Sequence, residues 1–442
     1  MPLKASLKKV ASAILADVEP RLPARRTGVA TRKPQVESER FARRAVFPGG
    51  KMPPSTAGKD AFRHIFSQAL KVLVIPDKFK GTLTAQAAAR AIAKGWKKIR
   101  PQDTLDLLPM TDGGDGFGEV MGELLRAKNR RLKTTDAAHR SCIACWWWEP
   151  ETKTAIIESA KIIGLAMLPR GRFHPFRLDT SGLAAALRAA EAAGAKHCVI
   201  GIGGSATNDG GFGLARALGW KFLDRKSNPI ERWTELHRLH RIQAPASRVH
   251  VNDLSVAVDV QNPLLGSRGA TRVYGPQKGL RPEDFAPAEK CLRRLAAVVK
   301  KDFGRDLARM PGAGAAGGLG FGLLAFAGAK LVPGFNLFVR HAKLERRLNS
   351  ADLVIVGEGA IDPSTFMGKG VGEIIARCRQ PKIPCIALAG VINAPSRQRR
   401  QFASSHALVE LTSQKEAMKN PAYHLERLAS QTAEEWRIPT LE

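Results

Sequence analysis

Short apolar runs alternate with helical segments from about residue 72 onward. Five runs have the length and apolar content of buried strands: VLVI (72–75), AIIESA (155–160), CVIGIGG (198–204), DLVIVGEG (352–359) and PCIALAG (384–390). Two alanine-rich stretches have helical spacing, namely 84–96, which Thr82 or Thr84 can cap, and 183–195, which Gly194 closes. Strands that alternate with helices predict an α/β fold, with a parallel sheet covered by helices on both faces.

Residues 1–70 have a different pattern. They are basic, interrupted by prolines, and show no sustained periodicity beyond a short amphipathic stretch at 3–16. Their arginines and serines resemble a transit peptide, but acidic residues such as Asp17 and Glu19 speak against one. We therefore expect a poorly ordered basic extension that precedes the folded part.

The net charge of +30 is the compositional outlier in a chain with an ordinary apolar fraction of 44%. The first 70 residues hold 14 Lys and Arg against 5 Asp and Glu, so most of the excess lies elsewhere. A surface that reads single-stranded nucleic acid interleaves basic residues with stacking aromatics, and the sequence shows no such arrangement. Positive potential that attracts small anionic substrates fits, although solvated surface lysines and arginines explain most of the charge without any function, and nucleic acid is not an expected partner.

Cysteine usage and hydropathy indicate a cytoplasmic protein. The six cysteines are scattered, and the pair Cys142 and Cys145 has no second pair at zinc-site spacing, which predicts reduced thiols. No apolar run approaches the roughly 20 residues of a membrane span. The run Trp146–Trp148 is expected to alternate across a strand and to serve packing.

The segment GIGGSATNDGGFG (201–213) is the strongest candidate for a binding loop, because it follows a predicted strand. Consecutive glycines, Gly203 and Gly204 among them, let backbone N–H groups point at an anion. The Ser205 hydroxyl adds a donor. Asn208 and Asp209 follow at the tip, where Asp209 is a candidate general base for a substrate hydroxyl.

A second glycine-rich segment, PGAGAAGGLGFG (311–322), is expected to lead into a helix whose N-terminus suits phosphate. We assign nucleotide binding to Gly312, Gly314, Gly317 and Gly318. The alternative is that these small residues allow close helix packing. The segment is neither a Walker A motif nor a dinucleotide fingerprint that follows a clear strand.

Two further loops after strands carry acidic residues beside lysines or glycines. In PDKFKGTLTA (76–85), Asp77 can hold a substrate hydroxyl or a metal, and Lys80 can neutralise an anion. In TDGGDG (111–116), Asp112 is a candidate Mg²⁺ ligand, since Mg²⁺ prefers carboxylate oxygens and water. A tight turn with solvated charges is the alternative for both loops.

The loop GEGAIDPSTFMGKG (357–370) follows the predicted strand at 352–359. Glu358 and Asp362 are candidates for metal or ribose contacts, and Lys369 can reach a phosphate. A solvated loop is the alternative.

Taken in order, these segments resemble the type-1 glycerate kinases over about residues 71–430. The resemblance rests on PDKFKGTLTA, MTDGGDG, GIGGSATNDGG, QNPLLG, GPQKG, PGAGAAGGLG and GEGAID. It implies transfer of a phosphoryl group from ATP to D-glycerate with Mg²⁺, usually giving 2-phosphoglycerate. It also implies a Rossmann-like domain built from discontinuous segments, an inserted α/β domain, and an active site in the cleft between them.

We place the domains accordingly. The extension covers 1–70, the Rossmann-like domain 71–120 and 290–442, and the inserted domain 121–289. The chain departs from the family pattern at Lys78, Asp115, Phe117, Ala360 and 180–187, which leaves a kinase for another small hydroxy acid as an alternative. A non-catalytic sensor or nucleic-acid binder that keeps the fold is the second alternative.

The resemblance and the loop chemistry together give each residue a hypothetical role. We assign catalysis to Asp209, Lys80 and Asn208. Nucleotide binding falls to the four glycines of 311–322 with Ser205 and Lys369. Substrate binding falls to Asp77, Gly203 and Gly204, and Mg²⁺ to Asp112, Glu358 and Asp362. Glycerate and ATP are the expected partners, and a homodimer is compatible with the sequence.

Overall fold

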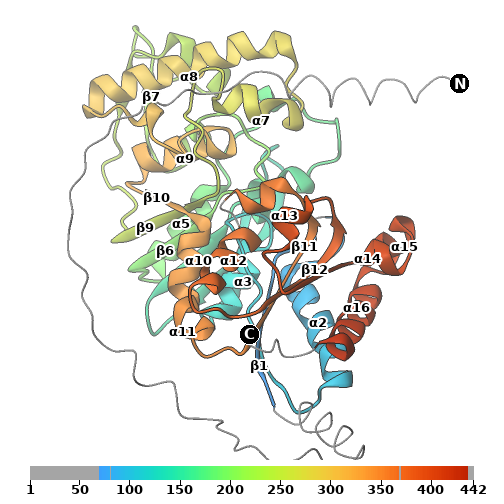
Figure 1. Cartoon of the computed structure of the whole chain (residues 1–442). Coiled ribbons are helices and arrows are strands. Elements are labelled where there is room, and N and C mark those ends of the chain that lie inside the picture. The colour runs from blue at the N-terminus through green and yellow to red at the C-terminus, as the bar shows by residue number, and fades with distance from the viewer. Residues whose placement is uncertain (1–68, 80, 368–369, 437–442) are drawn as a thin grey trace, which may run out of the picture. The chain divides into compact units, whose positions relative to one another are not determined.

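The computed structural model describes residues 69–79, 81–367 and 370–436 (Figure 1). The described residues belong to one compact unit. Almost all of the predicted extension, as well as Lys80 and Lys369, lies outside the described residues. Among the residues described, no helix has the length and apolar content that a membrane span needs.

A five-stranded sheet joins segments from both ends of the folded region. Its order is β13-β12-β11-β1-β2, and every pair is parallel. The strands are β1 (Lys71–Pro76), β2 (Thr104–Leu107), β11 (Leu353–Ile361), β12 (Cys385–Ile392) and β13 (Ser404–Ala407). Figure 1 shows α2 (Ala85–Ile99) and α16 (Pro421–Glu435) side by side, and they pack together on one face of the sheet.

Alternation along β1 explains why helices cover both faces of this sheet. Val72 and Val74 pack with α2 and α16, whereas Leu73 and Ile75 pack against the opposite core. That second core includes α10 (Gly334–Ala342) and α12 (Val371–Arg379). The predicted α/β architecture with a parallel sheet is confirmed here.

A six-stranded sheet has the order β10-β9-β6-β5-β4-β3. Its strands are β3 (Lys128–Thr135), β4 (Ser141–Glu149), β5 (Thr154–Glu158), β6 (His197–Gly201), β9 (Asp253–Val258) and β10 (Lys330–Pro333). The pairs from β10 to β5 are parallel, and β3 and β4 run antiparallel at one edge. Trp146 and Trp148 enter one core and Trp147 the other, so the expected alternation is confirmed.

The division into two domains stays a prediction, but the sheets bear on its boundary. Strand β10 at 330–333 pairs with β9 of the six-stranded sheet, although the expected boundary at 290 puts it in the other domain. If the two sheets belong to different domains, the chain returns to the domain of the five-stranded sheet between Pro333, which ends β10, and Gly334, which begins α10.

The remaining elements connect or cover the sheets. Further helices are α3 (Phe117–Leu124), α5 (Leu183–Ala192), α6 (Phe212–Ala217), α7 (Ala270–Lys278), α8 (Pro282–Phe303) and α9 (Ala315–Phe326). The short elements are α4 (Ala160–Ile163), α11 (Leu344–Leu348), α13 (Ser396–Arg399), α14 (Leu408–Leu411), α15 (Gln414–Lys419), β7 (Lys221–Leu223), β8 (Arg241–Gln243) and the 3₁₀ segments η1 (Leu165–Met167), η2 (Pro175–Arg177), η3 (Trp233–Arg238), η4 (Leu307–Arg309) and η5 (Pro363–Phe366).

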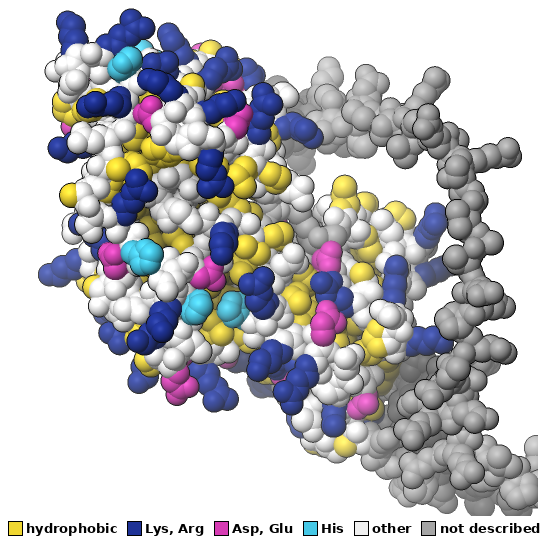
Figure 2. Space-filling model, turned by 90° about the vertical axis from the view of Figure 1, so that its left-hand side faces the viewer, with side chains coloured by type: hydrophobic (Ala, Val, Ile, Leu, Met, Phe, Trp, Pro, Cys, Tyr) yellow, Lys and Arg dark blue, Asp and Glu magenta, His cyan; other side chains and the backbone are white. Residues whose placement is uncertain are grey.

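Basic side chains are spread widely over one face of the molecule. Figure 2 shows lysines and arginines scattered over the described part of one face, among acidic, histidine and uncharged side chains, rather than gathered in a stripe. A nucleic-acid footprint concentrates Lys and Arg on one surface, so this distribution does not favour the nucleic-acid-binding alternative.

Candidate active site

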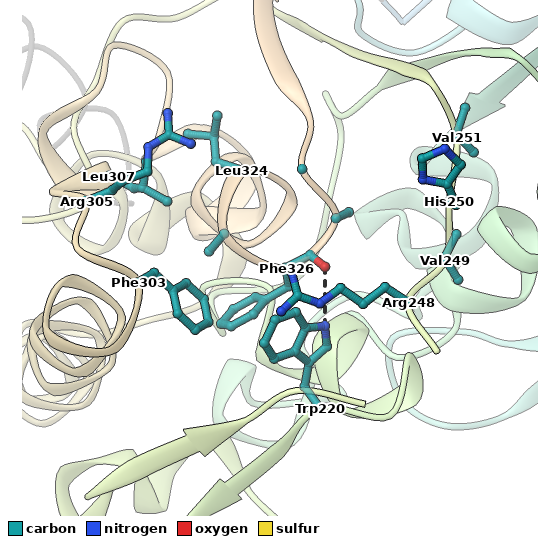
Figure 3. Close-up of a pocket in the computed structure, with 13 residues that line it drawn as sticks. Trp220, Arg248, Val249, His250, Val251, Phe303, Arg305, Leu307, Leu324 and Phe326 are labelled. Atoms are coloured by element: carbon teal, nitrogen blue, oxygen red, sulfur yellow. Dashed lines mark hydrogen bonds between the residues drawn. The ribbon is translucent and has the colours of Figure 1, made fainter. Parts of the chain in front are cut away.

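Two concavities stand out on the described part of the chain, and one of them contains predicted site residues. The smaller, of about 420 Å³, is lined by Trp220, Arg248, His250, Phe303 and Arg305, with Arg248 over the Trp220 ring (Figure 3). The larger is a cleft of about 2500 Å³. It receives the ends of parallel strands from both sheets, which is where α/β proteins bind ligands. This cleft is the candidate active site.

Loops after β1 and β2 form one wall of the cleft. Asp77 and Lys78 directly follow β1, and the Asp77 N–H donates to Gly357 O at 2.7 Å, which ties this loop to β11. The Lys78 N–H donates to Asp77 Oδ1 at 2.7 Å. Lys78 Nζ also stands 3.5 Å from Asp112 Oδ1, so the sequence motifs at 76–85 and 111–116 meet.

Carboxylates lie close together at this wall: Asp77 and Asp112 line the cleft, and Glu358 lies behind them without lining it. Burial raises the pKa of Asp77 to about 6, with the charge of Asp112 adding to the effect and that of Lys78 opposing it. Burial also raises the pKa of Glu358 to about 7, against a 2.8 Å hydrogen bond from Thr365 Oγ1. Asp77 and Glu358 therefore bind protons more tightly than isolated carboxyls, chiefly because they are buried and in smaller part because neighbouring carboxylates repel them.

Glu358→Gln is expected to stabilise the protein in a pH-dependent way. The native carboxyl keeps its proton up to about pH 7, whereas the unfolded one loses it near its ordinary pKa, so wild-type stability falls as pH rises through this window. The glutamine can still accept from Thr365 without a buried charge. The gain should reach about 1–3 kcal/mol above pH 7 and vanish at low pH.

Urea unfolding of Glu358→Gln at pH 4.5 and 8 checks this expectation. Glu151→Gln, in an exposed turn, is the control and should change little at either pH. A stability difference of equal size at both pH values would contradict the assignment of a costly buried charge to Glu358.

The loop after β6 forms the facing wall and touches the first. Gly203 and Gly204 line the cleft together with Ser205. The Gly203 N–H donates to Gly113 O at 3.1 Å, and a Cβ on Gly204 would stand 2.2 Å from Asp115 Oδ1. A Cβ on Gly203 would stand 2.6 Å from the backbone Cα of Gly114, so only glycine allows the two loops to approach this closely at that position.

Asn208 and Asp209 lie behind this wall and do not line the cleft. Asp209 is completely buried, and its Oδ2 accepts from Thr180 N, Thr180 Oγ1 and Gly213 N, while Oδ1 accepts from Gly211 N. Burial, followed by the charge of Asp179, raises the pKa of Asp209 to about 6. Because both oxygens are engaged, the geometry favours a positioning role over the predicted general base.

Asn208 is held in the same layer. Its Nδ2 donates to Thr271 Oγ1 on α7 at 3.1 Å, and the side chain is completely buried. Asn208 therefore joins the loop to α7 behind the cleft wall, while its Oδ1 has no hydrogen-bond partner among the described residues, and its catalytic role stays a prediction.

The glycines of the second glycine-rich segment serve packing. A Cβ on Gly314 would stand 2.2 Å from Pro263 O, and one on Gly317 would stand 1.9 Å from Thr207 O. Gly312 and Gly318 are similarly enclosed by Val258 and Gly210. Ala315 and Ala316 of this segment line the cleft, whereas the four glycines do not. The geometry thus supports close packing, which was the alternative to nucleotide binding.

Gly317→Ala is expected to lower the free energy of unfolding by about 2–5 kcal/mol, because it adds a backbone clash to a left-handed conformation with φ of +70°. Gly328→Ala is the matched control, with φ of +66° and open space around the added methyl. It should cost only about 1–2 kcal/mol. Chemical denaturation measures both, and equal losses would contradict the packing role.

The other predicted residues divide between the cleft and its surroundings. Ser205 lines the cleft, and its Oγ lies 2.9 Å from Thr207 Oγ1. Asp362 turns toward its own 3₁₀ segment, η5, where its Oδ1 accepts from Ser364 N and Oγ, and these bonds lower its pKa. Its carboxylate is therefore committed to a turn, which does not favour a role in metal binding.

Several residues that line the cleft were not predicted from the sequence. Glu158 ends β5, and its carboxylate accepts from Gly116 N at 3.0 Å and Gly118 N at 2.8 Å. Burial and the charge of Glu119 raise its pKa to about 7. Asp259 follows β9, and Lys278 ends α7. The position of Glu158 at the end of a predicted strand was the available signal, whereas Lys278 stood in a motif, GPQKG, to which the residues alone gave no role.

The fold and cleft define a class. This is an α/β protein in which glycine-rich and acidic loops at the carboxyl ends of parallel strands surround one cleft, the arrangement with which such proteins bind small charged molecules. More particularly, the chain belongs to the glycerate kinase family, whose sequence profile matches residues 72–437.

Similar proteins are named as glycerate kinases. The chain is 38% identical over 322 residues to a glycerate kinase of Halalkalibacterium halodurans, covering 72% of this chain and 85% of that protein. It is 36% identical over 320 residues to glycerate 2-kinase of Escherichia coli, covering 71% and 84%. A crystal structure assigned as glycerate kinase 2 from Salmonella typhimurium LT2 superposes with a TM-score of 0.71 at 33% identity, covering 83% and 98%.

Proposed function

We propose that the protein transfers the γ-phosphoryl group of ATP to a hydroxyl of D-glycerate, giving phosphoglycerate, with 2-phosphoglycerate as the expected isomer. Family membership supports the reaction class. The observation that carries the proposal is the meeting of Asp77, Lys78 and Asp112 with Gly203–Ser205 around one cleft. Phosphoryl transfer depends mainly on the positioning of the reactants and on stabilisation of their charge, and the residues around this cleft can supply both.

The residues of the cleft can account for each step of the proposed phosphoryl transfer. The acceptor hydroxyl oxygen forms a bond to the γ-phosphorus, and the bond from that phosphorus to the β,γ-bridging oxygen breaks, so ADP leaves. We assign acceptance of the hydroxyl proton to Asp77. Its pKa of about 6 leaves it largely ionised at neutral pH, and it lies at the cleft surface. Lys78 is a cation beside it for the anionic reactants.

Mg²⁺ is part of the proposal. Among the residues described, no cluster of three or more metal-ligating side chains is preformed. Asp112 and Glu358 nevertheless fit Mg²⁺, because the ion takes few protein carboxylates and completes its shell with water and phosphate. The carboxylates lie close enough that the charge of Asp112 adds to the raised pKa of Asp77, and that of Asp77 to the raised pKa of Glu358, which favours a cation here. When bound, Mg²⁺ would neutralise phosphate charge.

Other roles remain predictions. Lys80 and Lys369 lie outside the described residues. The cytoplasmic location, the homodimer and the exact acceptor acid also stay predictions.

A panel of small hydroxy acids in an ADP-release assay tests the acceptor. D-Glycerate should give the highest kcat/KM, and lactate, which lacks the second hydroxyl, should give a much lower value. A higher kcat/KM with another hydroxy acid would replace glycerate as the substrate while leaving the phosphotransferase class in place.

A further inference from the structure

A lysine is buried in the glycine-rich wall of the cleft. Lys278, the last residue of α7, lines the cleft, yet its side chain is only 6% exposed. Its Nζ donates to Thr207 O at 2.6 Å, the backbone carbonyl two residues after Ser205. The ammonium group therefore lies, from the side of α7, against the loop that continues from Gly203–Ser205, at a buried carbonyl just behind the residues that line the cleft.

Charged neighbours do not fully offset this ammonium. Asp209 follows Thr207 by two residues and raises the pKa of Lys278, but its own oxygens already accept four hydrogen bonds. On α8, Asp284 bonds His174, and Glu289 lies within ion-pair distance of arginines. Helix α9, which also packs on α7, has no titratable side chain.

Burial therefore dominates and lowers the pKa of Lys278 to about 7. An ammonium withdrawn from water is stable only when an anion accompanies it. In the described part of the chain, Lys278 forms no ion pair of its own within 4.0 Å, although it borders a cleft large enough for a nucleotide and an acid.

We infer that Lys278 is the cation that pairs with an anionic oxygen of a bound substrate at the Gly203–Ser205 wall. This inference rests on the proposed function, which supplies two such oxygens: a phosphate oxygen of the nucleotide and the carboxylate of the acceptor acid. Pairing restores the charge of the amine. Ligand binding is therefore accompanied by proton uptake at pH values above the pKa that Lys278 has in the ligand-free protein.

Calorimetric titration tests this inference with ADP and D-glycerate as separate probes at pH 8, each in two buffers of different ionisation enthalpy. The variants are Lys278→Met and Lys278→Arg, with Lys290→Met on the exposed side of α8 as control. Lys278→Met should weaken one ligand by about tenfold or more and leave the other nearly unchanged. The affected ligand identifies the source of the anion.

Proton uptake separates pairing from mere support of the loop. Wild type should take up a fraction of a proton with the affected ligand, Lys278→Met should not, and Lys278→Arg should recover affinity without the uptake because arginine stays charged. Unchanged affinities, or equal weakening of both ligands, would overturn the inference. If Lys278→Met does not fold, wild-type affinity should still fall between pH 6 and 9, while that of Lys278→Arg should stay flat; parallel profiles would overturn it.

Failure of the proposed function has a different signature. Wild type that neither binds ADP nor converts D-glycerate would refute the reaction itself. Turnover by wild type with full activity in Lys278→Met would refute only the role of Lys278.

Discussion

Asp77→Asn should lower kcat for glycerate phosphorylation by about 10²–10⁴, because it removes the carboxylate that accepts the hydroxyl proton. The fold should survive. The asparagine Oδ1 can still accept from Lys78 N, as Asp77 Oδ1 does at 2.7 Å. Removing a carboxylate whose pKa burial has raised should leave stability at pH 8 unchanged or slightly higher. Steady-state kinetics and thermal unfolding measure the two effects separately.

The control for Asp77→Asn is Asp253→Asn. Asp253 begins β9 at the end opposite the cleft and is partly exposed, so its loss should leave kcat nearly unchanged. In wild type, kcat/KM should also fall as pH drops through about 6, because protonated Asp77 cannot accept a proton. Activity of Asp77→Asn within tenfold of wild type would remove this residue from the mechanism.

Asp209→Ala should lower the free energy of unfolding by about 3–5 kcal/mol, the second large effect. It leaves four buried donors without an acceptor: Thr180 N, Thr180 Oγ1, Gly211 N and Gly213 N. Asp209→Asn should cost less, about 1–3 kcal/mol, since one amide oxygen can replace Oδ2 while the amide nitrogen faces a donor. Urea denaturation ranks the two variants.

Activity distinguishes this role of Asp209 from that of a general base. Asp209→Asn should retain kcat within about tenfold of wild type, because its carboxylate does not reach the cleft. Asp306→Asn, at an exposed ion pair, is the control for stability and should change it by no more than about 0.5 kcal/mol. A fully folded Asp209→Asn with activity reduced by orders of magnitude would restore the general-base assignment.

The parts of the site that sequence could predict are those fixed by local order. An apolar run followed by polar or glycine residues marks the end of a buried strand, and parallel strands bring such ends to one edge. Asp77, Asp112 and Gly203–Ser205 were found in this way, and the structure brings them to one cleft. The strands predicted at 72–75 and 384–390 correspond to β1 and β12 for the same reason.

The parts that sequence could not predict depend on distant partners. Asp209 turns inward because Thr180, 29 positions earlier, supplies two donors. The burial of Lys278 could not be predicted, because the carbonyl that its ammonium group binds belongs to Thr207, 71 positions earlier in the chain. The glycines of 311–322 permit either an anion or another backbone to approach, and only the position of Thr207 and Pro263 decides for packing.

The most direct test of the account is turnover of ATP with D-glycerate and Mg²⁺, with the products followed by ³¹P and ¹³C NMR. We expect equal amounts of ADP and a phosphoglycerate monoester, with a pattern of phosphorus–carbon couplings that identifies the esterified carbon, and loss of both signals in Asp77→Asn. Release of inorganic phosphate without a phosphoglycerate signal, or equal turnover by Asp77→Asn, would contradict it.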